Sequence, residues 1–133
     1  MRLTSRSEYA LLALIYLARQ SAEDYISAET IAEAQTIPLK FLEQILVTLK
    51  RAKYLRSMKG QHGGYSLARP ADKITIAEVI RLLDGPLAPT ESVSKYFYRP
   101  TPIEKEDKLI QLFTAIRECM LQQLESTTLA DVS

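Results

Sequence analysis

Side chains that can bind nucleic acid gather between residues 38 and 53. At the helical spacing of about 100° per residue, polar and basic groups share one face of this segment. Amide and carboxylate groups can hydrogen-bond to base edges, and basic groups can bind phosphates. The polar face comprises Lys40, Glu43, Gln44, Val47, Thr48 and Arg51, with Phe41 at its border. The opposite, apolar face comprises Leu42, Ile45, Leu46, Leu49 and Ala52, which predicts packing on a core.

A glycine-rich turn follows between two short alternating runs, residues 55–59 and 65–67. This pattern is typical of a β-hairpin. Its tip carries Lys59, Gln61 and His62. Glycine permits positive φ and a close approach of the backbone to another molecule. The hairpin tip is therefore a second predicted contact with nucleic acid.

The charge is distributed unevenly although the chain carries a formal net charge of only +1. Residues 40–69 contain 7 Lys or Arg side chains and one acid, Glu43. Residues 74–133 contain 6 basic and 9 acidic side chains. A basic block in a nearly neutral chain favours a polyanion-binding surface joined to a different region. A solvated helix face is the alternative explanation of the charge alone.

The sequence contains few side chains that could act in catalysis or bind a metal ion. A single cysteine and a single histidine exclude an intramolecular disulfide, an all-cysteine metal site and a histidine-pair zinc motif. No paired carboxylates, Ser/His arrangement or nucleotide-binding loop is present, so we expect no catalytic residues. No apolar run reaches the roughly 18 residues of a membrane span. The N-terminus shows no signal-peptide pattern, which predicts a cytoplasmic protein.

Five helices and one hairpin are expected. The helices are predicted over about 5–20, 27–34, 38–53, 76–83 and 104–124, with Ser27 and Thr75 as N-caps and Pro38 at a first helical position. The first helix is apolar nearly all round, so a partner subunit could cover its second side. The predicted domains are a DNA-binding unit over 1–84, an irregular loop over 85–104, and a dimerisation helix with a C-terminal tail over 105–133.

A helix–turn–helix followed by a β-hairpin is a winged helix–turn–helix, in which the second helix of the pair enters the major groove. Ile31 and Ala32 would support that helix from behind. Motifs over almost the whole chain complete this pattern. They are Met1-Arg2-Leu3-Thr4-Ser5, Phe41-Leu42-Glu43-Gln44-Ile45-Leu46, the run 55–69 around Gly63-Gly64-Tyr65, Ile74-Thr75 with Glu78-Val79-Ile80, and Thr128-Leu129-Ala130-Asp131. Together they resemble the signature of the IscR/NsrR/CymR-type (Rrf-two) family of bacterial transcription regulators.

The resemblance implies a homodimeric winged-helix regulator, mainly α-helical, that binds double-stranded DNA at an imperfect palindrome. Its long C-terminal helix would cross that of the partner and pack on the partner's first helix. The residues predicted to contact DNA are Arg2, Ser5, Lys40, Phe41, Glu43, Gln44, Thr48, Arg51, Arg56, Lys59, Gly60, Gln61 and His62. The residues predicted to form the dimer interface are Leu109, Leu112, Phe113, Ile116, Met120 and Leu124.

Many members of this family hold an iron–sulfur cluster with three cysteines in the loop before the long helix. Residues 86–104 contain no cysteine, and thiolates are the usual cluster ligands. We therefore expect no cofactor and no metal, and we interpret Glu8, which resembles an extra ligand of some members, as a surface or interface carboxylate. Cys119 is expected to be a buried thiol at a helix interface. Residues 96–98, Tyr-Phe-Tyr, are expected to pin the loop onto the core, and a ligand pocket is the alternative.

Two other functions remain open on the sequence alone. One is a redox or iron–sulfur sensor that uses Cys119 or ligands other than cysteine. The other is a winged-helix module that binds proteins and no longer reads DNA. The basic block over 40–69 argues against the second.

Overall fold

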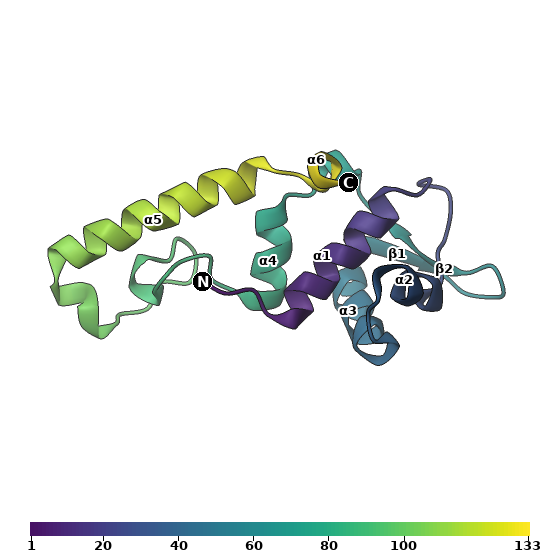
Figure 1. Ribbon diagram of the computed structural model, residues 1–133, viewed down its shortest axis with the longest axis horizontal. Helices are drawn as coiled ribbons and strands as arrows, with labels where there is room; N and C mark the ends of the chain where they lie inside the picture. The colour runs from purple at the N-terminus through teal and green to yellow at the C-terminus, as the bar shows by residue number, and fades with distance from the viewer.

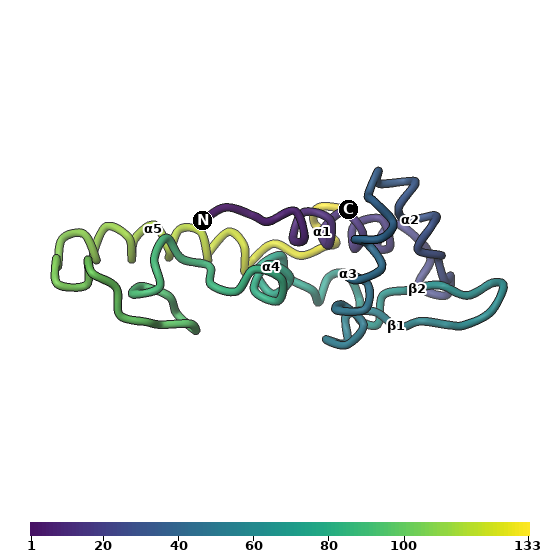
Figure 2. Tube along the Cα trace, turned by 90° about the horizontal axis from the view of Figure 1, so that it is seen from below, coloured from purple at the N-terminus to yellow at the C-terminus, as the bar shows by residue number.

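The computed structural model describes residues 1–133 as a helical body with a two-stranded hairpin at one end and a long helix at the other (Figures 1 and 2). The elements in chain order are α1 (Ser5–Ala18), α2 (Ala28–Gln35), α3 (Leu39–Arg51), β1 (Leu55–Met58), β2 (Gly64–Leu67), α4 (Ile76–Asp84), α5 (Asp107–Ser126) and α6 (Leu129–Val132). Short 3-10 turns cover Ala71–Lys73, Glu91–Val93 and Pro102–Lys105. The predicted fold class, a winged helix–turn–helix with a long C-terminal helix, is confirmed.

The helix–turn–helix arises from local capping. The Ser27 side chain accepts a hydrogen bond from the Thr30 amide and begins α2. Thr36 adopts a left-handed conformation with φ 55° and ends α2. Pro38, predicted at the first helical position, occupies the N-cap of α3 instead, so the helix begins one residue later, at Leu39. The turn between the two helices is therefore confirmed, with its boundaries shifted by a residue.

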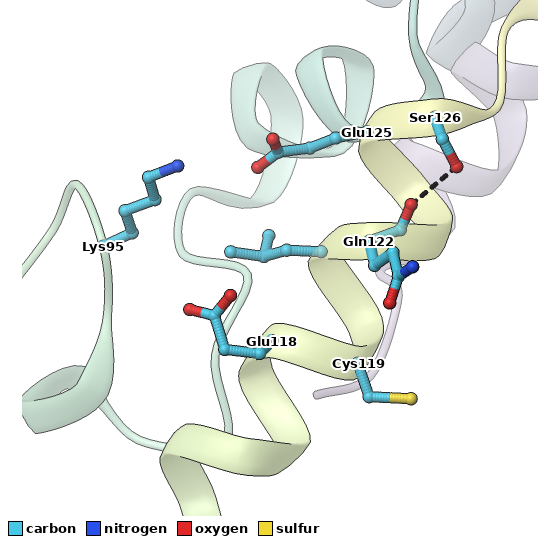
Figure 3. A pocket seen from close by; sticks show the side chains of 7 residues that line it. Lys95, Glu118, Cys119, Gln122, Glu125 and Ser126 are labelled. Atoms are coloured by element: carbon cyan, nitrogen blue, oxygen red, sulfur yellow. Dashed lines mark hydrogen bonds between the residues drawn. The ribbon is translucent and has the colours of Figure 1, made fainter.

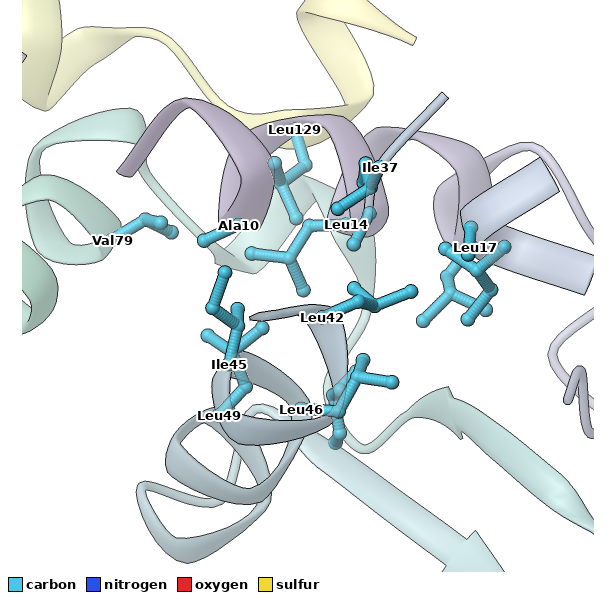
Figure 4. Close-up of a cluster of buried hydrophobic side chains, with 14 of the residues drawn as sticks. Ala10, Leu14, Leu17, Ile37, Leu42, Ile45, Leu46, Leu49, Val79 and Leu129 are labelled. Atoms are coloured by element: carbon cyan, nitrogen blue, oxygen red, sulfur yellow. The ribbon is translucent and has the colours of Figure 1, made fainter. Parts of the chain in front are cut away.

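The main core lies where α3 crosses α1 (Figure 4). Leu42, Ile45, Leu46 and Leu49 are at most 1% exposed, as the apolar face of α3 predicts. They pack in one cluster with Leu14 of α1. Full burial of such side chains contributes roughly 1.5–3 kcal/mol each. This packing fixes which face of α3 points outward.

The α6 helix was not predicted, and it enters the main core. Leu129 is completely buried in the same cluster as α1. Its amide donates to the Ile74 carbonyl at 2.9 Å, and the Ile76 amide donates to the Thr127 carbonyl at 2.9 Å. α4 and α6 of the same chain thus cover α1. That a partner subunit could cover the second side of α1 stays a prediction, because Leu11, Leu12, Ile15 and Tyr16 are only half-buried within the chain.

α5 extends away from the body and touches it mainly through α4 (Figure 1). Leu121, absent from the predicted apolar stripe, is 5% exposed and packs with Ala77 and Ile80 of α4. Leu124 packs against the same cluster. The predicted dimerisation stripe therefore divides, because Leu124 faces the chain's own α4 while Leu109, Leu112 and Ile116 are exposed.

The loop before α5 is held by hydrogen bonds to its backbone and by buried side chains, among them Leu87 and Val93. Arg117 of α5 donates to the Val93 carbonyl at 2.6 Å, and Val93 itself is buried. The aromatic residues 96–98 are 61%, 44% and 54% exposed, so the expectation that they pin the loop onto the core was wrong. The guanidinium carbon of Arg81 lies over the Tyr96 ring, 4.7 Å from the ring centre.

Candidate DNA interface

The outward face of α3 is polar and has no partner within the chain. Lys40, Glu43, Gln44 and Arg51 are exposed, and their side chains form no hydrogen bond or ion pair with the protein. Thr48 is half-buried and donates its hydroxyl to the Gln44 carbonyl at 3.1 Å. Although the Thr48 hydroxyl donates to this backbone carbonyl, the hydroxyl oxygen can still accept a hydrogen bond. The face therefore offers donors and acceptors that only another molecule can use.

The hairpin is held beside α3 by contacts of β1 with α3 and by a bridge from β2 to a third segment. Leu55 pairs with Leu67 and Met58 with Gly64 in an antiparallel register. β2 also forms a bridge to Ile26, in which the Tyr65 amide donates to the Ile26 carbonyl at 2.7 Å. This third segment fixes the direction in which the hairpin tip projects (Figure 2).

Gly64 is required by the fold rather than by a ligand. A Cβ at Gly64 would lie 2.3 Å from the Ile26 carbonyl oxygen, and its φ is 151°. The glycines were expected to let the backbone approach another molecule. At Gly64 the close approach is instead to the backbone of Ile26 in the same chain. Gly60, by contrast, has φ 109° and open space around it. Gly60, Lys59, Gln61 and His62 are all exposed at the tip.

Tyr54, Arg69 and Glu78 tie the root of the hairpin to α4. The Glu78 carboxylate accepts from the Tyr54 hydroxyl at 2.8 Å and from Arg69 at 3.0 Å. Partial burial opposes ionisation of Glu78, but hydrogen bonds from Thr75, Tyr54 and Arg69 outweigh it and hold the pKa of Glu78 below its ordinary value. Burial and the same carboxylate raise the pKa of Tyr54 to about 12. At neutral pH the Glu78 carboxylate and the Arg69 guanidinium form an ion pair, and this cluster holds the root of the hairpin against α4.

The start of α1 lies beside α3. A hollow between them is lined by Ser5, Arg6, Tyr9, Phe41, Gln44 and Ile45. Ser5, a predicted DNA contact, is thereby brought next to Gln44, whereas Arg2 lies exposed in the preceding arm. Arg6 is exposed at the same hollow and was not among the predicted contacts. The sequence signal for Arg6 is the positive charge of residues 1–6, which contain two arginines. Its nearness to α3 depends on the tertiary fold.

Asp84 at the end of α4 fixes this N-terminal arm, which sequence reasoning also missed. Its carboxylate accepts from the Thr4 amide at 3.1 Å and from the Thr4 hydroxyl. Partial burial works against the charge, but these bonds and nearby Arg6 hold the pKa of Asp84 below its ordinary value. Thr4 in turn caps α1.

Arg56 is oriented partly toward the chain. Its guanidinium donates to the Ala22 carbonyl at 2.8 Å and lies 5.7 Å from the Tyr25 ring centre. The side chain is nevertheless exposed. Its remaining N–H groups could still reach a phosphate, so its predicted contact stays a prediction.

Comparison with known proteins decides the family. The family described as "Rrf2: Iron-dependent Transcriptional regulator" matches residues 3–133. The chain belongs to the Rrf2 family. It is 38% identical over 136 residues to an HTH-type transcriptional regulator of Mycobacterium tuberculosis, covering 100% of this chain and 81% of the relative. It is 31% identical to the HTH-type transcriptional regulator CymR of Bacillus subtilis, covering 100% of this chain and 90% of CymR.

Solved structures of Rrf2-type regulators share the fold. The structure of CymR, the global cysteine regulator of B. subtilis, matches with a TM-score of 0.85 at 30% identity, over 99% of this chain and 95% of that one. The structure of T. potens IscR matches with a TM-score of 0.71 at 28% identity, over 99% and 85%. This Rrf2 chain is accordingly a DNA-binding, winged-helix transcriptional regulator. None of its helices is long and apolar enough to cross a membrane.

Proposed function

We propose that the chain acts as a homodimer on a palindromic operator, with α3 in the major groove and the hairpin tip on the adjacent backbone or minor groove. The observation that carries the proposal is the outward face of α3, which is exposed, polar and without partners in the chain. In winged-helix proteins the second helix of the pair reads base edges. The polar face of α3, the hairpin tip and the start of α1 together form the proposed interface.

Gln44 is the proposed reader of one base pair, because a glutamine amide can bond in two places to adenine. Selecting bound duplexes from a random pool should yield a motif with two half-sites about one helical turn apart. The Gln44→Ala variant should lose preference at one base pair in each half-site by about 1–3 kcal/mol. Gln111→Ala, an exposed glutamine on α5 away from the proposed interface, is the matched control and should leave the motif unchanged. An unaltered motif with Gln44→Ala would remove this residue from the readers.

The homodimer is supported by the outer face of α5. Leu109, Leu112 and Ile116 are 40%, 52% and 40% exposed on one side of the helix. Leu121 is the only one of its 20 residues that the chain buries. An apolar stripe on a helix so far from its own core favours a partner, and a second copy of the same helix is self-complementary.

Leu112→Ala should weaken the dimer, since it removes apolar contact from both protomers. We expect the dimer dissociation constant, measured by sedimentation over a dilution series, to rise about tenfold or more. Gln111→Ala, the exposed neighbour on another side of α5, should leave that constant unchanged. A wild-type chain that sediments as a monomer at micromolar concentration would overturn the homodimer.

We also propose that this member works without an iron–sulfur cluster, although its family is described as iron-dependent. The donor set does not fit one. Cys119, the only cysteine, is exposed on α5 of the single chain, so its expected burial at a helix interface would require a partner subunit. Its sulfur points away from the carboxylates of Glu118 and Glu125 (Figure 3). No three His, Cys, Asp or Glu side chains gather anywhere in the chain as a metal site would require.

Protein purified without oxygen should therefore contain no stoichiometric iron and show no visible absorbance band. Iron bound at one or more equivalents per dimer, lost in Cys119→Ser, would overturn this part of the proposal. A regulator that binds the bacterial chromosome acts in the cytoplasm, and we propose that location here.

A further inference from the structure

Val47 is an apolar side chain in the middle of the polar face of α3, and it is 47% exposed. Gln44 precedes it by three positions and Arg51 follows it by four. Residues three and four apart are neighbours on a helix surface. Val47 is thus flanked by Gln44, which can bind a base edge, and by Arg51, which can bind a phosphate.

Nothing in the chain explains the exposure of Val47. The four core leucines and isoleucines of α3 lie on the opposite face and are at most 1% exposed. The other exposed apolar side chains of α3, Leu39 and Phe41, belong to its first turn. The N-terminal half of α5, which carries Leu109, Leu112 and Ile116, lies at the far end of the molecule from α3 (Figures 1 and 2). A dimer formed through α5 would therefore leave Val47 uncovered.

The chemistry of the major groove offers one apolar group to such a side chain. Among the base edges exposed there, only thymine carries a methyl group, at C5. We infer that Val47 packs against a thymine methyl in each half-site and so selects a T·A pair. The inference rests on the proposed function, because it requires α3 to lie in the major groove.

The position of that thymine follows from helix geometry. Gln44 and Val47 are separated by three residues, a rise of about 4.5 Å along the axis. Base pairs are stacked about 3.4 Å apart. The thymine should lie one or two base pairs from the pair whose preference Gln44→Ala relaxes.

The test is a methyl-deletion cycle on the duplex selected by the wild-type protein. Each thymine is replaced in turn by deoxyuridine, which removes only the C5 methyl group. At one position per half-site the wild type should lose about three- to fivefold in affinity, the effect expected for one buried methyl. Val47→Ala should bind the thymine and deoxyuridine duplexes equally. Val47→Thr, which keeps one methyl, should recover part of the difference.

Arg51→Gln is the matched control from the next turn of α3. It should weaken binding to every duplex while keeping the full methyl effect of the wild type. A selected motif in which no methyl matters, or a methyl effect that persists in Val47→Ala, would overturn the role of Val47 and leave the proposed function intact. A pool from which the wild type enriches no motif would instead overturn both.

Discussion

Affinity for the selected duplex should fall by about 10³- to 10⁵-fold when salt is raised from about 50 to about 200 mM, provided that the dimer makes about 6–10 phosphate contacts. Each phosphate neutralised by a basic side chain releases condensed counterions, so the logarithm of the binding constant falls linearly with the logarithm of salt. Fluorescence anisotropy on a labelled duplex measures this slope. The exposed basic side chains on and beside α3 and the hairpin are Lys40, Lys50, Arg51, Lys53, Arg56 and Lys59.

Single variants assign the slope to this surface. Arg51→Gln removes one phosphate contact per protomer, so the slope of the dimer should become shallower by about 2. Lys108→Gln, an equally exposed change at the start of α5, should leave the slope unaltered. Binding that is insensitive to salt would mean that the basic block of residues 40–69 does not meet DNA. If Lys108→Gln altered the slope as much as Arg51→Gln, the phosphate contacts would lie at α5 as well as at α3.

The elements that form the interface could be predicted because their signals are local. α3 repeats its apolar residues at helical spacing, so Leu42 to Leu49 define its inner face and leave Gln44 outside. The hairpin follows from alternation around glycines, and the start of α2 from the Ser27 cap. Each of these signals is contained within about a dozen residues, and each was confirmed.

The parts that could not be predicted depend on contacts between distant segments. Arg6 reaches the hollow beside Gln44 only because α1 crosses α3. Glu78 braces the hairpin through Tyr54 and Arg69, which are 24 and 9 residues away in the sequence. In the loop before α5, Val93 is buried whereas Tyr96 is exposed. Periodicity and composition carry no information about such pairings.

α6 is the extreme case, because four residues are too few to show helical periodicity. Its Thr128 side chain caps the helix, and a bridge between Thr75 and Thr128 positions it against α1. Leu129 then fills the core beside Leu14 of α1 (Figure 4), in one cluster with Ile74. α6 is therefore part of the DNA-binding body, although the loop after α4 carries the chain far from that body and α5 brings it back (Figure 1).

Leu129→Ala should consequently lower the free energy of unfolding by about 2–5 kcal/mol, the cost of a cavity left by a fully buried leucine. Urea titration followed by circular dichroism measures the change. Val132→Ala is the matched control on the same helix, where the side chain is 42% exposed, and it should cost less than about 0.5 kcal/mol. A loss below about 1 kcal/mol for Leu129→Ala would mean that α6 is detached in solution. α1, which borders the proposed DNA interface, would then lack the cover that holds it against α3.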